Sequence, residues 1–156
     1  MQGRMKEHPL SPDEISTLLL TEPVGNLGSI SDDGFPYITP VHFVLIEEKI
    51  YIHGLRAGQK IEYLNKNSKV GFEVFRFNGL IHDPTLPCET NTDYQSVILL
   101  GTAKLIDDEE LKIRVLDEIV KKYTPQHIGK TYPTAMLKST GVIEIIPQVL
   151  TGKYFK

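Results

Sequence analysis

A short basic segment with the sequence GLRAGQK spans residues 54–60 and directly follows an apolar run that ends in His53. Its residue types suit a phosphate group. Free backbone amides and the positive end of the helix dipole meet at a helix start, where Gly58, Arg56 and Lys60 could hold an anion. A plainer reading is that Gly58 only permits the turn and that the two cations are solvated. The local sequence leaves both readings open.

Two apolar-rich runs precede this segment and predict the strands that position it. Residues 37–46 follow a tight turn at 32–34, and residues 49–53 form the next run. Alternation along the first run predicts two faces: Tyr37, Thr39, Val41, Phe43 and Leu45 on one, and Ile38, Pro40, His42, Val44 and Ile46 on the other. Both faces are largely apolar, which predicts a barrel wall buried on two sides. Pro40 cannot donate a ladder hydrogen bond, so it marks an edge, a bulge or an interruption.

The remaining pattern completes a small barrel. Strands are predicted over 24–31, 37–46, 49–53, 69–77, 93–106 and 140–146. Helices are predicted from the capping-box Ser11 to about residue 22, over 56–67, and after the acidic cap at 107–110. The last of these helices has one apolar stripe, formed by Leu111, Val115, Leu116, Ile119, Val120 and Tyr123. Residues 78–92 read as a long irregular loop. Six strands, mostly hairpin-connected, with four short helices predict an α+β fold, a six-stranded antiparallel split β-barrel with short flanking helices.

Composition excludes several classes of protein. The 156 residues are 40% apolar and 24% charged, with a net charge of −3, which fits one globular domain over 1–156. The weakly acidic balance argues against nucleic acid as a partner. A single cysteine, Cys88, allows no internal disulfide and predicts a reducing compartment. Without an apolar signal core or a run of 18 apolar residues, we expect a cytoplasmic protein that does not enter a membrane.

Three segments carry a resemblance to a known family. The first runs from Gly25 to Phe43 and continues with KIYIHG at residues 49–54, Gly58 and Lys60. The second has the pattern C-x5-Y-x-S-V-x3-G from Cys88 to Gly101. The third joins residues 142–145 to 151–153. Their order and spacing together resemble the pyridoxamine 5'-phosphate oxidase-like FMN-binding split barrels, within them the branch related to nitroimidazole-resistance (nitroimidazole reductase) proteins.

The resemblance implies a flavin site built from the basic segment and the strand before it. The cofactor would be FMN, with FAD possible. Its phosphate would lie against the turn and its ring along the main chain of the strand, with these residues in contact: Thr39, Pro40, Val41, His42, Phe43, Gly54, Arg56, Gly58, Gln59 and Lys60. His53 would face flavin and substrate and donate a hydrogen bond or a proton. A lone strand-end histidine is more often a polar terminus, and the His42 side chain reads as structural or interfacial.

A second subunit would complete that site. Tyr94 and Ser96 alternate onto one face of their strand, which ordinary sheet packing also explains. In the resembled family this segment lies near a two-fold axis and reaches the flavin bound mainly by the other subunit. Gln95 stands where many relatives carry arginine, so a second cationic contact is not expected there. Gly54 stands where many carry serine, and its amide could partly replace the phosphate contact of that hydroxyl. We therefore expect a homodimer with a composite site.

The leading hypothesis is an FMN-dependent oxidoreductase. NAD(P)H would supply electrons, and a small acceptor such as a nitroimidazole or another nitroaromatic compound would take them. Two alternatives remain: a flavin-binding or flavin-sequestering protein without dedicated turnover, and a haem-binding split barrel. No metal site is predicted, because His82, Asp83 and Cys88 lack a familiar ligand geometry.

Overall fold

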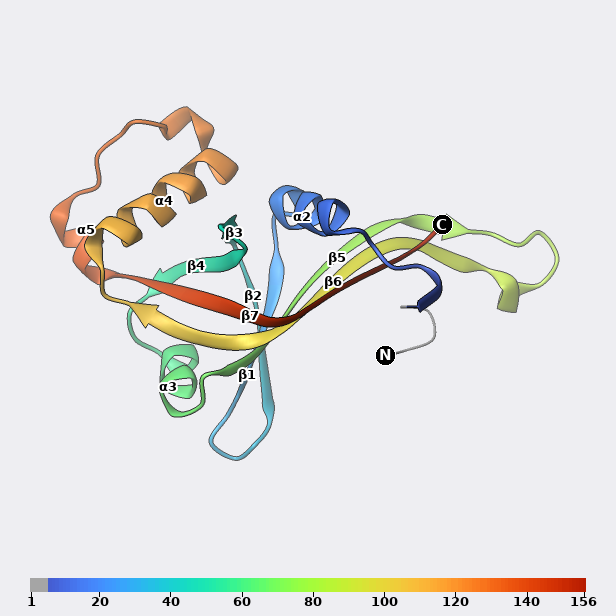
Figure 1. Cartoon of the computed structure of the whole chain (residues 1–156), viewed down its shortest axis with the longest axis horizontal. Coiled ribbons are helices and arrows are strands. Elements are labelled where there is room, and N and C mark those ends of the chain that lie inside the picture. Colours follow the sequence, from blue (N-terminus) through green and yellow to red (C-terminus); the bar gives the residue numbers. More distant parts are fainter. Residues whose placement is uncertain (1–5) are drawn as a thin grey trace.

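The computed structural model describes residues 6–156. Over that part of the chain, seven strands form one antiparallel sheet in the order β2-β1-β5-β6-β7-β4-β3 (Figure 1). The strands are β1 (Gly25–Ile30), β2 (Pro36–Val41), β3 (Phe43–Ile46), β4 (Lys49–Leu55), β5 (Lys69–Ile81), β6 (Asn91–Ile106) and β7 (Thr140–Phe155). The helices are α2 (Pro12–Thr21), α3 (Gln59–Lys66), α4 (Glu109–Tyr123) and α5 (Thr134–Ser139), with 3-10 turns at Pro87–Glu89 and Pro125–His127.

The two edges of the sheet are joined by one residue. β2 pairs only with β1 and β3 only with β4, so these strands stand at opposite ends of the sheet order, yet only His42 separates them along the chain. The sheet must therefore curl until its edges meet, which is the geometry of a split barrel. The predicted fold class is confirmed. The predicted count of six strands is wrong, because residues 37–46 divide at His42 into two strands.

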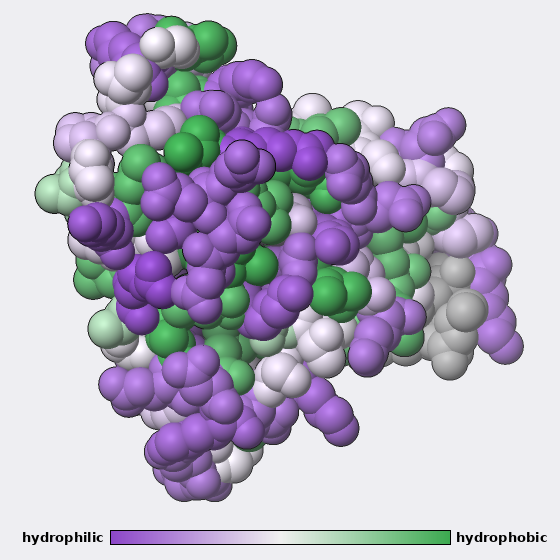
Figure 2. All heavy atoms as spheres, turned by 60° about the vertical axis from the view of Figure 1, so that its left-hand side comes forward, coloured by the Kyte–Doolittle hydropathy of each residue, from purple (hydrophilic) through white to green (hydrophobic). Residues whose placement is uncertain are grey.

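The sheet packs against apolar side chains on both of its faces. One buried cluster fills the barrel and includes Phe43, Ile52 and Phe72. A second, smaller cluster lies beneath α4, whose Val115 and Ile119 pack onto β4 and β7. The apolar stripe predicted for this helix is thus confirmed. The end of the molecule that carries α4 and α5 shows mostly hydrophilic side chains, with scattered hydrophobic ones between them (Figure 2).

Three strands extend further than the sequence predicts. β5 continues to Ile81 and β6 begins at Asn91, so the predicted loop over 78–92 shrinks to the residues between these strands. β7 runs to Phe155 rather than ending at residue 146, because an irregularity in its pairing with β6 accommodates Pro147. Residues 75–96 form an arm that projects away from the barrel (Figure 1).

Among the helices of residues 6–156, none is both long enough and apolar enough to cross a membrane. α2 has the predicted capping box, in which the Ser11 side chain accepts from the Glu14 amide and Glu14 accepts from the Ser11 amide.

Candidate functional site

His53 lies near the end of β4, where it pairs with Val142 of β7. Its side chain is half-buried, and its Nδ1 atom is buried without a hydrogen-bond partner among residues 6–156. Burial lowers the pKa of His53, and the nearby His42 and Lys60 lower it further. A neutral imidazole with one unused nitrogen can donate or accept a hydrogen bond from a bound group.

The basic segment contains Gly58, whose backbone conformation favours glycine. Gly58 has φ 116° and caps α3, and a side chain is strained at that angle. The predicted helix start at residue 56 is wrong, because the left-handed Gly58 delays the helix to Gln59. Lys60 follows in the first turn. Its half-buried ammonium group forms no hydrogen bond or ion pair within the described part of the chain, and burial lowers its pKa.

The other predicted phosphate contacts are engaged within the chain. Arg56 Nη2 lies 2.6 Å from Asp107 Oδ1 in an ion pair, and Gln59 Nε2 donates to Tyr63 Oη at 2.7 Å. Gly54 has open space where a Cβ atom would stand. The structure therefore brings Lys60 close to His53, while the guanidinium of Arg56 is directed towards Asp107 in this conformation.

Thr39 supplies a second unpaired polar atom. It lies on β2, an edge strand as Pro40 predicts, and its hydroxyl is buried without a partner among residues 6–156. Tyr37, two residues earlier on the same face of β2, contacts Tyr63 of α3 with ring centroids 5.3 Å apart. Lys60 and Tyr63 share a face of α3, since residues three apart on a helix are neighbours. Thr39 thus lies on the strand face that the Lys60 side of α3 covers.

The corner between β2 and β3 is held by the end of α4, which the sequence did not indicate. Tyr123 Oη accepts from the Phe43 amide at 2.9 Å, and its ring stacks on His42 at 4.5 Å between centroids. Lys122 Nζ donates to the carbonyls of Leu19 at 3.1 Å and Phe43 at 3.2 Å. Burial lowers the pKa of Lys122 to about 8. A hydroxyl at the end of an apolar helix stripe was the only sequence signal for this contact.

A shallow hollow opens at that corner. Its volume is 320 Å³, and its lining residues are Val24, Pro40, Val41 and His42. His42, which directly follows β2, is exposed, whereas Val41 and Phe43 on either side of it are buried, as the predicted alternation requires. Of the residues with predicted main-chain contacts, Pro40, Val41 and His42 therefore border open space, whereas the Phe43 amide and carbonyl are engaged with Tyr123 and Lys122.

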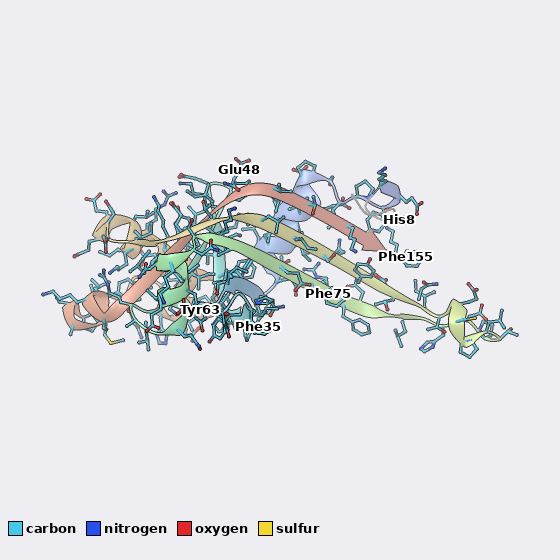
Figure 3. All side chains as sticks on the ribbon, turned by 90° about the horizontal axis from the view of Figure 1, so that it is seen from below. His8, Phe35, Glu48, Tyr63, Phe75 and Phe155 are labelled. Atoms are coloured by element: carbon cyan, nitrogen blue, oxygen red, sulfur yellow. The ribbon has the colours of Figure 1, made fainter. Side chains whose placement is uncertain are left out.

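Tyr94 and Ser96 lie on the arm, far from His53 of the same chain. His53 of β4 pairs with Val142 of β7, and Val142 pairs in turn with Ile106 of β6. Tyr94 lies twelve residues before Ile106 on β6, which corresponds to roughly 40 Å of extended strand. Tyr94 stacks on Phe75, and Ser96 is buried. Figure 3 shows Phe75 well separated from Tyr63 of α3. One chain does not bring these residues into the site around Lys60.

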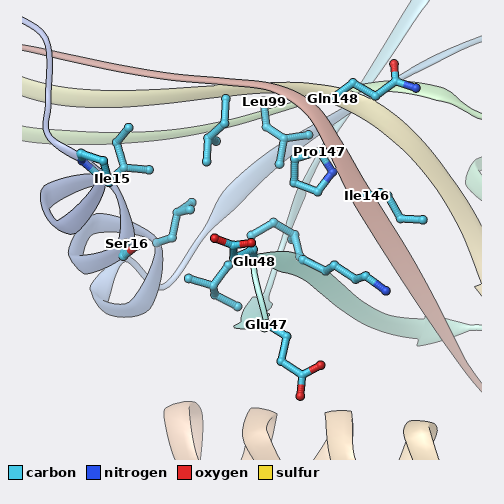
Figure 4. A pocket seen from close by; sticks show the side chains of 14 residues that line it. Ile15, Ser16, Glu47, Glu48, Leu99, Ile146, Pro147 and Gln148 are labelled. Carbon is cyan, nitrogen blue, oxygen red and sulfur yellow. The ribbon is translucent and has the colours of Figure 1, made fainter.

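A larger cavity of 490 Å³ lies elsewhere, between α2, the β3–β4 turn and the irregular part of β7 (Figure 4). Its walls are mainly apolar, and Glu48 and Gln148 are among its few polar residues. No residue of the predicted site lines it. Cys88 is exposed, and residues 6–156 contain no group of three or more metal-ligating side chains. The unpaired polar atoms, rather than this cavity, define the candidate site.

Residues 11–154 match the family model described as pyridoxamine 5'-phosphate oxidase. The chain belongs to this family. The resemblance carried by the three sequence segments is thereby confirmed, although no curated protein matches the chain. The family match covers every residue of the predicted site.

Solved structures share the fold at low sequence identity. A candidate 5-nitroimidazole antibiotic resistance protein from Bacteroides thetaiotaomicron is 24% identical, with a TM-score of 0.82 over 93% of this chain and 85% of that chain. A flavocytochrome from Azotobacter vinelandii is 23% identical, with a TM-score of 0.87 over 99% of this chain and 72% of that chain. An FAD and haem binding protein from Mycobacterium smegmatis is 20% identical, with a TM-score of 0.79 over 94% of this chain and 72% of that chain. These similarities establish the architecture.

Proposed function

We propose that this protein binds FMN at the site formed by β2, the end of β4 and the start of α3, and acts as a flavin-dependent oxidoreductase. Electrons from NAD(P)H would pass to a small acceptor such as a nitroimidazole. The observation that carries the proposal is the set of unused polar groups there: His53 Nδ1 and Thr39 Oγ1 have no partner among residues 6–156, and Lys60 has no anion. Buried polar groups are normally paired, so this set fits an absent polar ligand.

The chain's own groups match the parts of a flavin mononucleotide. Lys60 and the free amides at the start of α3 suit its phosphate, because a charge-assisted hydrogen bond and the helix dipole favour an anion there. The Thr39 hydroxyl and the main chain of Pro40 to His42 would offer hydrogen bonds to its polar edges. His53 can hold a proton beside the ring system. The cofactor would supply hydride transfer, while the protein orients it and tunes its surroundings.

Structural relatives support a flavin. One solved relative is described as an FAD and haem binding protein and another as an FAD-binding protein from Mesorhizobium loti. The relative described as a candidate nitroimidazole resistance protein suggests the class of acceptor. Because two relatives are described as containing haem or cytochrome, haem is the second candidate cofactor.

A second copy of the chain would complete the site. Gly28 and Gly71 face each other across β1 and β5 on the outer side of the sheet, and a Cβ atom at either would make only ordinary contacts. Neither has a positive φ. Packing within the chain thus does not require glycine there, and the 370 Å³ hollow above them, bordered by the exposed Ile38, leaves room for a partner's side chain. Such a dimer would let Tyr94 of one copy approach Lys60 of the other.

The absorption spectrum of freshly purified protein tests the proposal. We expect flavin bands and FMN in the released material, and a haem spectrum would support the second candidate instead. Protein that remains colourless after incubation with FMN would reject both. Anaerobic bleaching by NADH or NADPH, followed by reoxidation with a nitroimidazole, separates an oxidoreductase from a passive flavin carrier. His53→Ala should retain flavin and slow the reoxidation.

A further inference from the structure

Two histidines face each other where the β3–β4 ladder ends. The last recorded pair of this ladder is Phe43 with Ile52, so the next position places His42 opposite His53. Residues at such cross-strand positions are close enough to interact. The preceding pair on the same face, Val44 and Tyr51, lies beneath α4. Both imidazoles therefore belong to the α4 side of the sheet.

Tyr123 fixes the position of one of these two rings. Its ring stacks on His42 with an interplanar angle of 24°, and its hydroxyl accepts from the Phe43 amide. The same oxygen lies 2.8 Å from the Phe43 carbonyl oxygen and 2.9 Å from that of Pro23, and its O–H donates to these acceptors. The residue next to His42 is thus anchored to the helix that carries the stacking ring. His42 has little freedom to move away from β4.

The two rings differ in their access to water. His42 is exposed, whereas His53 is half-buried with an unpaired Nδ1 atom. A proton that moves from water to His53 would therefore pass close to the exposed imidazole of His42. No hydrogen bond joins the two rings within residues 6–156, so a proton passing between them would need a bridging water.

The charges around the pair disfavour two protons on it. Lys60 faces it from α3, and His42 and Lys60 both lower the pKa of His53, after burial. Nearby acids are engaged elsewhere: Glu144 of β7 with Lys49, Lys104 and Tyr51, Asp107 with Arg56, and Glu22 with Arg76. On α4, Lys122 donates to main-chain carbonyls, and burial raises the pKa of Tyr123, so it stays neutral. No carboxylate of residues 6–156 forms an ion pair with either imidazole.

We propose that His42 is a positioning residue for His53: the two imidazoles form a cross-strand pair that carries a single proton, which exposed His42 exchanges with water while Tyr123 holds it in place. The use of that proton at the flavin rests on the proposed function, whereas the pair itself does not. A proton given up by a His53 ring nitrogen would be replaced through His42. This couples a residue at the end of α4 to the protonation of the site.

Histidine titration by NMR on flavin-free, full-length protein tests the pair. The pKa of His53 should rise in His42→Gln, because a neighbouring imidazole that opposes its protonation is gone. His82→Gln removes an exposed histidine of the arm and should leave the His53 titration unchanged. A His53 titration that is identical in wild type and His42→Gln would overturn the proposal.

Tyr123 is tested by two substitutions. Tyr123→Phe keeps the stacking ring and should preserve the coupling, whereas Tyr123→Leu removes the ring and should weaken it, in samples whose melting confirms a folded protein. If Tyr123→Leu lowers stability too far, the comparison of Tyr123→Phe with His42→Gln still decides the matter, because a loss of coupling in Tyr123→Phe would contradict a role based on stacking.

The experiment separates this proposal from the proposed function. A His53 titration that shifts in His42→Gln, in a protein that binds no FMN, would keep the histidine pair and reject the flavin site. FMN binding with a His53 titration that is unchanged in His42→Gln would do the reverse. In the flavin-loaded protein, we expect His42→Gln to shift the pH profile of reoxidation by the acceptor, and an unshifted profile would show that the pair does not serve the reaction.

Discussion

Tyr51 and His53, two residues apart on β4, differ in whether the buried polar groups at their positions have hydrogen-bond partners. At Tyr51, the paired Glu144 carboxylate is almost fully buried and accepts from Tyr51 Oη at 2.7 Å and from Lys49 Nζ at 3.0 Å, with Lys104 Nζ at 3.3 Å. Two residues further along, His53 has a buried nitrogen with no partner within residues 6–156. Paired groups stabilise a fold, whereas a buried unpaired group costs free energy. The first position stabilises the fold, and at the second the proposed flavin would supply the missing partner.

The lysines repeat this contrast. Lys49 and Lys104 share one carboxylate, while Lys60 is half-buried without an anion in the described chain. An unpaired cation beside an unpaired imidazole and hydroxyl is an arrangement that an anionic, hydrogen-bonding ligand would complete. Substitutions in the two regions should therefore change different measured quantities.

The largest effect is expected at Glu144. Glu144→Ala leaves the buried Tyr51 hydroxyl and two cations without their acceptor, and should lower the free energy of unfolding by about 3 kcal/mol. Chemical denaturation measures this loss. FMN affinity of the folded variant should remain near that of wild type. Glu118→Ala, which breaks an exposed ion pair on α4, is the control and should be nearly neutral. If the free energy of unfolding of Glu144→Ala equals that of wild type, the paired groups around Glu144 do not stabilise the fold and the two regions do not differ in this respect.

Lys60→Ala should show the converse behaviour. Loss of the charge-assisted contact should raise the Kd for FMN by roughly 10- to 100-fold. The free energy of unfolding of the flavin-free variant should not fall, because Lys60 has no anionic partner to lose. Lys66→Ala removes a lysine from the other end of α3, where Lys66 pairs with Asp32, and serves as the control. Equal FMN affinity in Lys60→Ala and wild type, measured by fluorescence titration, would refute the phosphate assignment.

Thr39→Val offers a test in which two quantities change in opposite directions. Valine has a similar shape but lacks the unpaired hydroxyl, so the flavin-free protein should gain about 1 kcal/mol in unfolding free energy. FMN should bind several-fold more weakly if the hydroxyl contacts it, because a neutral hydrogen bond contributes roughly 1 kcal/mol. Denaturation and flavin titration of the same preparation measure both. A variant that loses stability would show that the hydroxyl has a partner in the folded chain.

Local patterns predicted the elements well but not how they meet. The fold class followed from alternation and turn residues, because these act over a few positions. The division of residues 37–46 at His42 did not, since the apolar pattern runs through it and its cause, the contact with Tyr123, comes from 80 residues away in sequence. The extension of β7 past Pro147 was also missed, because the irregular pairing that tolerates it depends on β6.

The candidate site was predictable only in part. The turn at Gly58 and the cation at Lys60 have a local physical meaning, and the family resemblance pointed to Thr39 and His53. Which of the cations stays unpaired depends on Asp107, which meets Arg56 only in the folded chain. Tyr123 was predicted as part of the apolar stripe of α4, but the stripe says nothing of where its hydroxyl lies.

The smallest expected effect is the pH dependence that His53 adds to stability. Its pKa is lowered in the folded state, chiefly by burial, so the unfolded chain takes up the proton first as the pH falls. The free energy of unfolding is thus unaffected by His53 above the unfolded pKa of about 6.5, and declines from there down to the folded pKa.

Denaturation of flavin-free wild type and His53→Gln at a series of pH values measures this contribution. The difference between their free energies of unfolding should change below about pH 6.5 in favour of the variant, because glutamine takes up no proton. A parallel pair of curves would mean that His53 is as readily protonated in the folded chain as in the unfolded one. Its imidazole would then be solvated, and the contrast with the buried, fully paired Glu144 would reduce to a difference in exposure.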